Sequence, residues 1–212
     1  MENKEKVVKS LGREIFEWFY TIVIAVAIAM LIKGFLFDIV KVDGSSMFPT
    51  LVHKDRLIVT KLGYKPEAGD IIILDSSYVK RNNYYSQLEQ SSGESLNGVE
   101  KFFKYFTLPK NLKKRYYVKR VVAMPGQTVD FKGGQLYVDG KAVEDSFGYT
   151  QPTDASVKYP VTVEEGKVFV LGDNRQNSTD SRSSALGQVP MEAILGKSQV
   201  RIWPLNEIGL TR

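Results

Sequence analysis

Two adjacent serines, Ser45 and Ser46, lie in the segment VDGSSMFPT (residues 42–50), directly after a long apolar run. A serine hydroxyl is a weak nucleophile unless a neighbouring group accepts its proton. The chain contains one histidine, His53, in the segment LVHKDR, which has the composition of a turn before a strand. A lone histidine is more often a surface or structural residue than a base. We therefore expect the proton acceptor elsewhere in the chain.

A lysine can replace histidine as the base if its amine is neutral near pH 7. Its pKa must then fall from near 10.4 to about 7, and burial among apolar side chains lowers a lysine pKa in this way. The segment YYVKRVV (residues 116–122) contains such a lysine. In a strand, Tyr117, Lys119 and Val121 share one face, so Lys119 has an aromatic and a β-branched neighbour. The alternative is an edge lysine whose ammonium group reaches solvent.

Composition excludes several other chemistries. The 212 residues include no cysteine, which excludes thiol catalysis, disulfides and cysteine-based zinc sites. One histidine does not support a histidine-based metal cluster, and we expect neither a metal nor a cofactor. The net charge is +5, but the basic residues are spread along the chain without a nucleic-acid-binding motif, so no nucleic-acid partner is expected. The SxxK pattern at residues 77–80 lacks a following KTG element, and we interpret it as chance.

The elements that would position the serine and the lysine begin with an apolar amino-terminal segment. Residues 18–32 (WFYTIVIAVAIAMLI) carry no charge, and about 20 residues between Ile15 and Phe37 can cross a bilayer as a helix. Trp18 and Tyr20 suit the membrane interface. A buried helix of a soluble protein and a cleaved signal sequence are the alternatives. The small-x-small cleavage motifs lie inside the apolar run and not after it, which favours a retained anchor.

Basic residues on the two sides of this segment indicate its orientation. Four precede it and two follow it closely, so the bias leans toward a cytoplasmic amino terminus. We expect residues 1–14 to form a short cytoplasmic segment, residues 15–37 a single-pass anchor in the cell membrane, and residues 38–212 an extracytoplasmic domain.

Beyond the anchor, short β-rich runs separated by turn residues predict a mainly β fold with an antiparallel sheet, without a repeat or a second domain. The segments KGG (residues 132–134) and VDGK (residues 138–141) are typical of hairpin turns. Residues 76–110 are polar and serine-rich, and we expect an exposed insertion in which part of residues 96–108 has a helical period. The expected strands are 56–61, 70–75, 115–124, 128–131, 135–140, 167–173 and 198–203.

Four separated segments follow the anchor: residues 44–50 (GSSMFPT), 69–73 (GDIII), 117–126 (YVKRVVAMPG) and 172–182 (GDNRQNSTDSR). In their order and spacing, these segments and the anchor resemble the sequence boxes and anchor of type I signal peptidases. The resemblance implies a membrane-anchored serine endopeptidase with a β-rich catalytic domain. Such an enzyme removes signal peptides from exported preproteins on the outer side of the membrane, so preprotein signal peptides and the lipid bilayer are the implied partners.

The resemblance also implies roles for individual residues. Ser46, directly before the methionine, corresponds to the nucleophile, and Lys119, in the Lys-Arg pair, corresponds to the general base. Ser178 is the implied hydroxyl partner of the lysine amine. Residues implied to support the site are Asp173, Asp180 and Arg182, and residues implied to wall the substrate pocket are Val42, Met47, Leu51, Tyr117 and Val118.

Several positions depart from part of the family, namely Gly44, Ala123, Gln127 and Gln176, and the first of them bears on the oxyanion hole. Gly44 stands where some members have a serine that assists the oxyanion hole, so the Ser46 N–H needs a second donor that the sequence does not identify. Two other functions are weighed against the peptidase. Soluble self-cleaving Ser/Lys repressors of the DNA-damage response lack a membrane segment, and a noncatalytic membrane-anchored assembly factor with this fold should have lost the Ser/Lys dyad.

Overall fold

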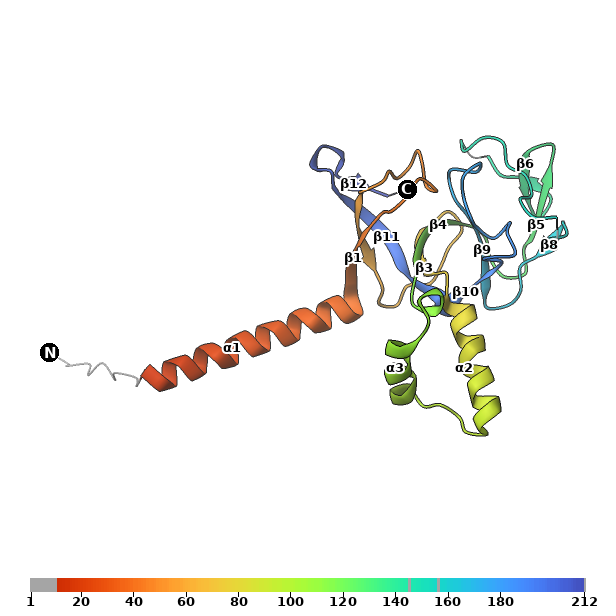
Figure 1. The fold of residues 1–212 in the computed structure, drawn as a ribbon. Helices are drawn as coiled ribbons and strands as arrows, with labels where there is room; N and C mark the ends of the chain where they lie inside the picture. Colours follow the sequence, from red (N-terminus) through yellow and green to blue (C-terminus); the bar gives the residue numbers. More distant parts are fainter. Residues whose placement is uncertain (1–10, 145, 156, 212) are drawn as a thin grey trace.

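A long apolar helix leads into the β-rich body of the molecule. In this computed structural model, which describes residues 11–144, 146–155 and 157–211, α1 (Leu11–Leu31) continues into the short π-helix η1 (Ile32–Leu36). The helix projects away from the body (Figure 1). The stretch Gly12–Leu36 is 25 residues long and apolar enough to cross a membrane. A helix suits that environment because it pairs its backbone polar groups internally.

The structure describes only part of the segment before the predicted anchor, and it places the end of the anchor in a strand. Of the expected cytoplasmic segment 1–14, residues 1–10 lie outside the described residues. Phe37, the last residue of the expected anchor, already belongs to β1 (Phe37–Lys41), where it pairs with Thr60. The chain therefore passes from the apolar helix directly into the sheet, without a flexible linker.

The main sheet is antiparallel and carries the strands around the candidate site. Its strand order is β1-β2-β11-β3-β4-β9-β10, and β12 pairs with β11. Central β3 is buried along its whole length because neighbouring strands and both faces cover it. The mainly β, antiparallel prediction is confirmed. The strands after β1 are β2 (Arg56–Thr60), β3 (Ile71–Asp75), β4 (Tyr116–Ala123), β9 (Lys167–Leu171), β10 (Val189–Pro190), β11 (Ile194–Trp203) and β12 (Gly209–Leu210).

A smaller antiparallel sheet packs beside the main sheet and has the order β7-β6-β5-β8 (Figure 1). Both predicted hairpin turns occur here. Gly133 and Gly134 have φ of 57° and 82°, and Asp139 and Gly140 have φ of 51° and 75°, as tight hairpin turns require. The strands are β5 (Thr128–Lys132), β6 (Gln135–Val138), β7 (Lys141–Ala142) and β8 (Val161–Thr162).

The insertion between β3 and β4 is helical. The sequence indicated helical period only in residues 96–108, which contain α3 (Gly98–Thr107). It did not predict α2 (Tyr78–Ser92), whose residues form no apolar stripe. A buried ion pair between Arg81 and Asp75, 2.6 Å apart, ties α2 to the end of β3. The short 3-10 helices are η2 (Lys110–Leu112), η3 (Met191–Ala193) and η4 (Leu205–Glu207).

The hydrophobic core consists of three clusters, one of which lies under the two serines. In that cluster the loop after β1 packs its apolar residues onto the inner faces of β2 and β3. Each fully buried aliphatic side chain contributes about 1.5–3 kcal/mol. This packing holds the serine loop against the sheet. The buried residues of the cluster are Val42, Met47, Leu51, Leu57, Val59, Ile71 and Ile73.

We predict that Gly196→Ala destabilises the main sheet. A Cβ at Gly196, in β11, would overlap the backbone carbonyl of Thr60, so the two strands would have to separate. Overpacking of this kind costs about 1–3 kcal/mol. Gly98→Ala is the matched control, because a Cβ there meets no atom within 4 Å. Thermal unfolding in detergent should show a lower transition temperature for Gly196→Ala only, and equal transitions for both variants would contradict the prediction.

Candidate active site

Ser46 lies in the loop between β1 and β2, and its hydroxyl meets a lysine. Lys119 Nζ donates a hydrogen bond of 2.8 Å to Ser46 Oγ. The residues around 174–177 hold this loop from the other side. Asn174 donates from its backbone N–H to the Ser46 carbonyl and from its side chain to the Ser45 carbonyl, and Asn177 Nδ2 donates to Ser45 Oγ. The serine is therefore fixed between the sheet and the loop after β9.

The local sequence explains why the loop takes this shape. Gly44 has a φ of 98°, a conformation that side chains with a Cβ rarely adopt. Met47 and Leu51 follow, each 1% exposed, and the Leu51 N–H donates to the Met47 carbonyl to close a turn. The two apolar side chains anchor the turn in the core. Ser46, between the flexible glycine and this anchored turn, is directed toward β4.

Lys119 is buried in the middle of β4, which lies between β3 and β9. Its amine donates to Ser46 Oγ and to the Val118 carbonyl, and it lies 5.2 Å from the centre of the Tyr117 ring. Burial lowers the Lys119 pKa from 10.5 to about 8, although the carboxylates of Asp180 and Asp173 oppose this shift. The edge-lysine interpretation does not apply, since Lys119 is 3% exposed.

The two aspartates form buried ion pairs. Asp173 accepts two hydrogen bonds from the Arg120 guanidinium, at 2.8 and 2.7 Å, and one from Thr50 Oγ1 at 2.6 Å. Asp180 accepts two from Arg182, each of 2.9 Å. Because Thr50 closes the serine box and Arg120 follows Lys119, the first pair ties three of the four boxes together.

The Ser178 hydroxyl is buried and makes no hydrogen bond to any described residue. A Cβ at Gly172 would overlap both Ser178 Oγ and the Ser46 carbonyl oxygen. Both groups therefore pack against the backbone of residue 172, where only glycine fits. In this structure the Lys119 amine donates to the Val118 carbonyl and not to Ser178. The orienting role of Ser178 stays a prediction.

A surface cavity of about 430 Å³ opens above Ser46 and Lys119. Two chain segments form its sides, residues 40–47 and residues 115–119, and Asn177 and Thr179 close one end. Of the predicted pocket residues, Leu51 packs in the core and does not line this cavity. The four that do line it are Val42, Met47, Tyr117 and Val118.

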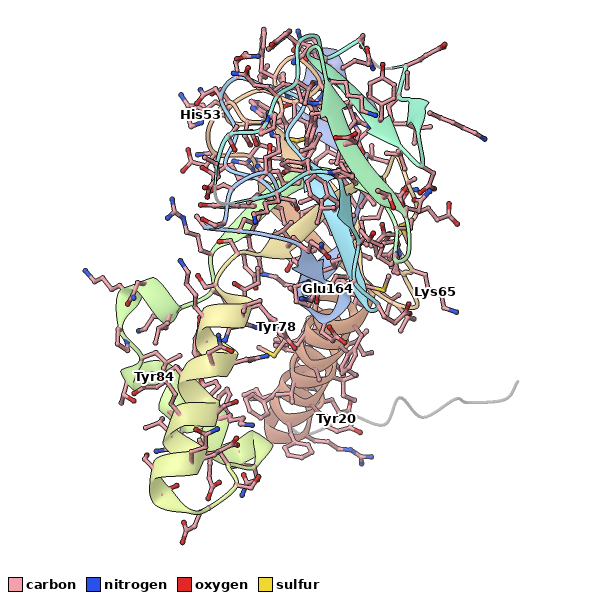
Figure 2. The ribbon with its side chains drawn as sticks, turned by 90° about the vertical axis from the view of Figure 1, so that its right-hand side faces the viewer. Tyr20, His53, Lys65, Tyr78, Tyr84 and Glu164 are labelled. Carbon is pink, nitrogen blue, oxygen red and sulfur yellow. The ribbon has the colours of Figure 1, made fainter. Side chains whose placement is uncertain are left out.

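His53 lies at the surface and away from Lys119. Its Nδ1 accepts a hydrogen bond of 3.3 Å from the Gly44 N–H and lies 3.3 Å from an Asp43 carboxylate oxygen. Figure 2 shows its side chain at the outer edge of the body. The histidine therefore supports the start of the serine loop and does not contact Ser46.

Sequence reasoning missed several residues of the site. It did not assign functions to Thr50, Arg120, Asn174 or Asn177, which hold the serine loop or its supporting aspartate. All four lie inside the four sequence boxes. Their position inside these boxes could have indicated that they belong to the site. Their partners, however, are 53 to 132 residues away in the sequence, and only the fold brings them together.

Known proteins match the chain along nearly its whole length. The signal peptidase, peptidase S26, family matches residues 15–203. Signal peptidase I of Bacillus licheniformis is 37% identical over 208 residues, covering 93% of each chain. Signal peptidase I T of Bacillus subtilis (strain 168) is 34% identical over 218 residues, covering 99% of this chain and 96% of the relative. A solved signal peptidase I from Enterococcus faecalis V583 is 25% identical with a TM-score of 0.41, covering 63% of this chain and 97% of that one.

The family and the apolar helix define a membrane-anchored peptidase with a β-rich domain. The chain belongs to the signal peptidase family, peptidase S26. These matches support the peptidase function and give no support to a noncatalytic assembly factor.

We predict that Lys119→Met stabilises the protein most at neutral pH. Below pH 8 the folded state holds a buried ammonium, whereas between pH 8 and 10.5 it has lost a proton that the unfolded state still binds. Wild-type stability should thus rise with pH through this window, and the advantage of Lys119→Met should shrink by roughly 2 kcal/mol between pH 7 and 10.

Urea unfolding of both proteins in detergent at the two pH values measures this difference. Lys65→Met is the control, because Lys65 is exposed and projects from the surface in Figure 2. A gain for Lys119→Met that is the same at pH 7 and pH 10 would show that burial does not perturb the amine.

Proposed function

We propose that this protein removes signal peptides from exported preproteins with Ser46 as nucleophile and Lys119 as general base. The observation that carries this proposal is the hydrogen bond of 2.8 Å between Lys119 Nζ and Ser46 Oγ, together with a lysine pKa of about 8. A lysine with its ordinary pKa would be protonated at neutral pH and unable to accept a proton. Burial in β4 therefore makes the serine reactive.

The reaction is an acyl transfer in two steps. Neutral Lys119 accepts the proton of Ser46 Oγ while the oxygen attacks the scissile carbonyl carbon, and a tetrahedral oxyanion forms. The peptide C–N bond then breaks, and the lysine returns the proton to the leaving amine. Water, deprotonated by the same lysine, attacks the ester and releases the signal peptide with Ser46 restored. The Ser46 N–H supplies one donor to the oxyanion, and Gly44 has no hydroxyl to supply a second.

The cavity indicates how the substrate lies. Residues 40–43 and 115–118 both line it, and each stretch includes part of a strand, β1 or β4. A substrate in extended form can place its backbone between them and its small side chains against Val42, Met47 and Val118. Small residues fit there because the core beneath these walls is tightly packed. This agrees with signal peptides, whose cleavage sites carry small residues.

The membrane anchor brings the site to its substrate. A signal peptide has its own apolar segment in the bilayer, and an enzyme held in the same bilayer meets it at a high effective concentration. We place residues 15–37 across the membrane, residues 1–14 in the cytoplasm and residues 38–212 outside it. The basic residues before the span support this orientation.

Ser46→Ala should abolish cleavage of a model preprotein, lowering kcat/KM by about 1,000-fold or more, because among the described residues Ser46 is the hydroxyl that the Lys119 amine contacts. Ser45→Ala is the matched control. It removes only the acceptor of the Asn177 hydrogen bond, worth about 1 kcal/mol, so activity should stay within about tenfold of wild type. Processing is followed in detergent by the mass of the product, and the reverse pattern would show that Ser45 is the nucleophile.

Lys119→Arg should lower turnover by about 100-fold or more, because a guanidinium stays protonated at every working pH. Wild-type kcat/KM should rise with pH and level off above pH 8, as the base loses its proton. His53→Ala should keep both the rate and this profile. Substantial turnover by Lys119→Arg, or an inactive but folded His53→Ala, would refute lysine as the base.

A further inference from the structure

The outward face of α3 is apolar. Val99, Phe102, Phe103 and Phe106 recur at helical spacing and are each 59–66% exposed. The Phe102 ring packs edge-on against Phe103 and Phe106, with ring centres 5.6 and 5.2 Å apart. The rings thus form one continuous apolar surface. On a soluble protein such a face normally packs against the body.

The polar side of α3 faces the protein instead. Lys101 forms an ion pair of 3.1 Å with Glu89 of α2, and its amine lies over the Tyr85 ring. Tyr85 OH also donates a hydrogen bond of 3.3 Å to the Lys101 carbonyl. These contacts fix the rotation of the helix about its axis. The apolar residues are therefore held away from the body and cannot turn inward without breaking them.

The helix is also firmly built. Asn97 caps its first turn, accepting from the Val99 and Glu100 N–H groups, while the Glu100 side chain accepts from the Asn97 N–H. The base of the helix pair is tied to the sheet, because the Asp75 carboxylate accepts from Arg81. An apolar face on a capped and tethered helix is a stable feature of the surface.

Basic residues gather where α3 ends. Lys104 lies in its last turn, and a short basic run follows from η2 to the start of β4. A basic cluster beside an apolar aromatic face is the pattern of a helix that lies in the interface of an anionic bilayer. The residues that form this basic run are the exposed Lys110 and Lys114. Lys113 instead donates to the Phe106 carbonyl, and Arg115 lies over the Tyr117 ring beside the candidate site.

The position of α3 agrees with contact to a membrane. Figure 1 shows α3 on the side of α2 that faces α1. In this view α1 leaves the body to the left and the helix pair leaves it downward, so α3 runs across the direction of α1. Because α1 is the helix that can cross the bilayer, its carboxyl end marks the level of the membrane surface. The apolar face of α3 lies beside this level and continues the membrane contact of α1.

We propose that α3 lies in the headgroup region of an anionic bilayer, with Val99, Phe102, Phe103 and Phe106 inserted and the basic run on lipid phosphates. The proposal rests on membrane anchorage by α1 and not on the catalytic assignment. Its consequence is geometric. The helix pair joins β3 to β4, the strand of Lys119, so a second membrane contact sets the tilt of the site relative to the bilayer.

The absence of cysteine in the chain allows a direct test with single labels. Phe103→Cys and Val99→Cys place a fluorescent NBD group on the apolar face, and Lys104→Cys places it one residue further on, on the polar side. Each full-length protein is reconstituted into vesicles of phosphatidylglycerol and phosphatidylcholine that carry a doxyl quencher in the acyl chains. The readout does not depend on peptidase activity.

We expect the labels at positions 103 and 99 to be quenched at least twofold more strongly than the label at position 104. In vesicles of phosphatidylcholine alone, this difference should decrease. Equal quenching at all three positions would overturn the proposal. So would a signal at position 103 that depends on the protein-to-lipid ratio and not on the quencher, because it would identify a second copy of the chain as the occupant of this face.

Discussion

The buried amine of Lys119 is the constraint on which the site depends. An ammonium group inside a protein is costly, so burial lowers the pKa of Lys119, and its amine lies within hydrogen-bond distance of Ser46 Oγ. Burial by itself would lower the pKa further. The carboxylates of Asp173 and Asp180 limit this decrease in the pKa. Each carboxylate is paired with an arginine, so neither forms an ion pair with the Lys119 amine.

The same ion pairs hold separate parts of the chain in register. Asp173 connects the end of β9 to Arg120 of β4 and to Thr50 of the serine loop. Asp180 and Arg182 brace the loop that carries Ser178, and the Arg182 guanidinium also donates to the Arg175 carbonyl. Breaking one partner of a buried pair is strongly destabilising, because a buried charge is left without compensation. The residues of these two ion pairs therefore stabilise both the site and the fold.

Two features of the molecule relate the site to a bilayer. Helix α1 runs without a linker into β1, and the β1 to β2 loop carries Ser46, so Ser46 lies close in sequence to the apolar helix. The helical insertion leaves from β3 and returns to β4, the strand of Lys119. Each member of the Ser/Lys pair is thus connected by a short, ordered segment to an element with an exposed apolar surface.

The sequence by itself determined the apolar helix, the β-rich class and most strands of the main sheet, and it singled out Ser46 and Lys119 as the predicted catalytic pair. These follow from local signals: an uncharged run, alternating apolar residues, glycine turns and four boxes in order. Strands β1, β7, β8, β10 and β12 were missed because they are short or merge with other signals. Helix α2 was missed because its residues form no apolar stripe, and the Asp75–Arg81 ion pair that ties it to β3 is a tertiary contact.

Only the tertiary structure decided which groups meet. It places Lys119 in an interior strand, where burial rather than sequence lowers the pKa, and it shows that Leu51 belongs to the core and His53 to the surface. It also orients α3 so that its apolar face points outward, which its helical period alone could not determine. The physical reason is common to all of these. Burial, rotation of a helix and contact across 50 to 130 residues depend on the packing of the whole chain, which no local pattern encodes.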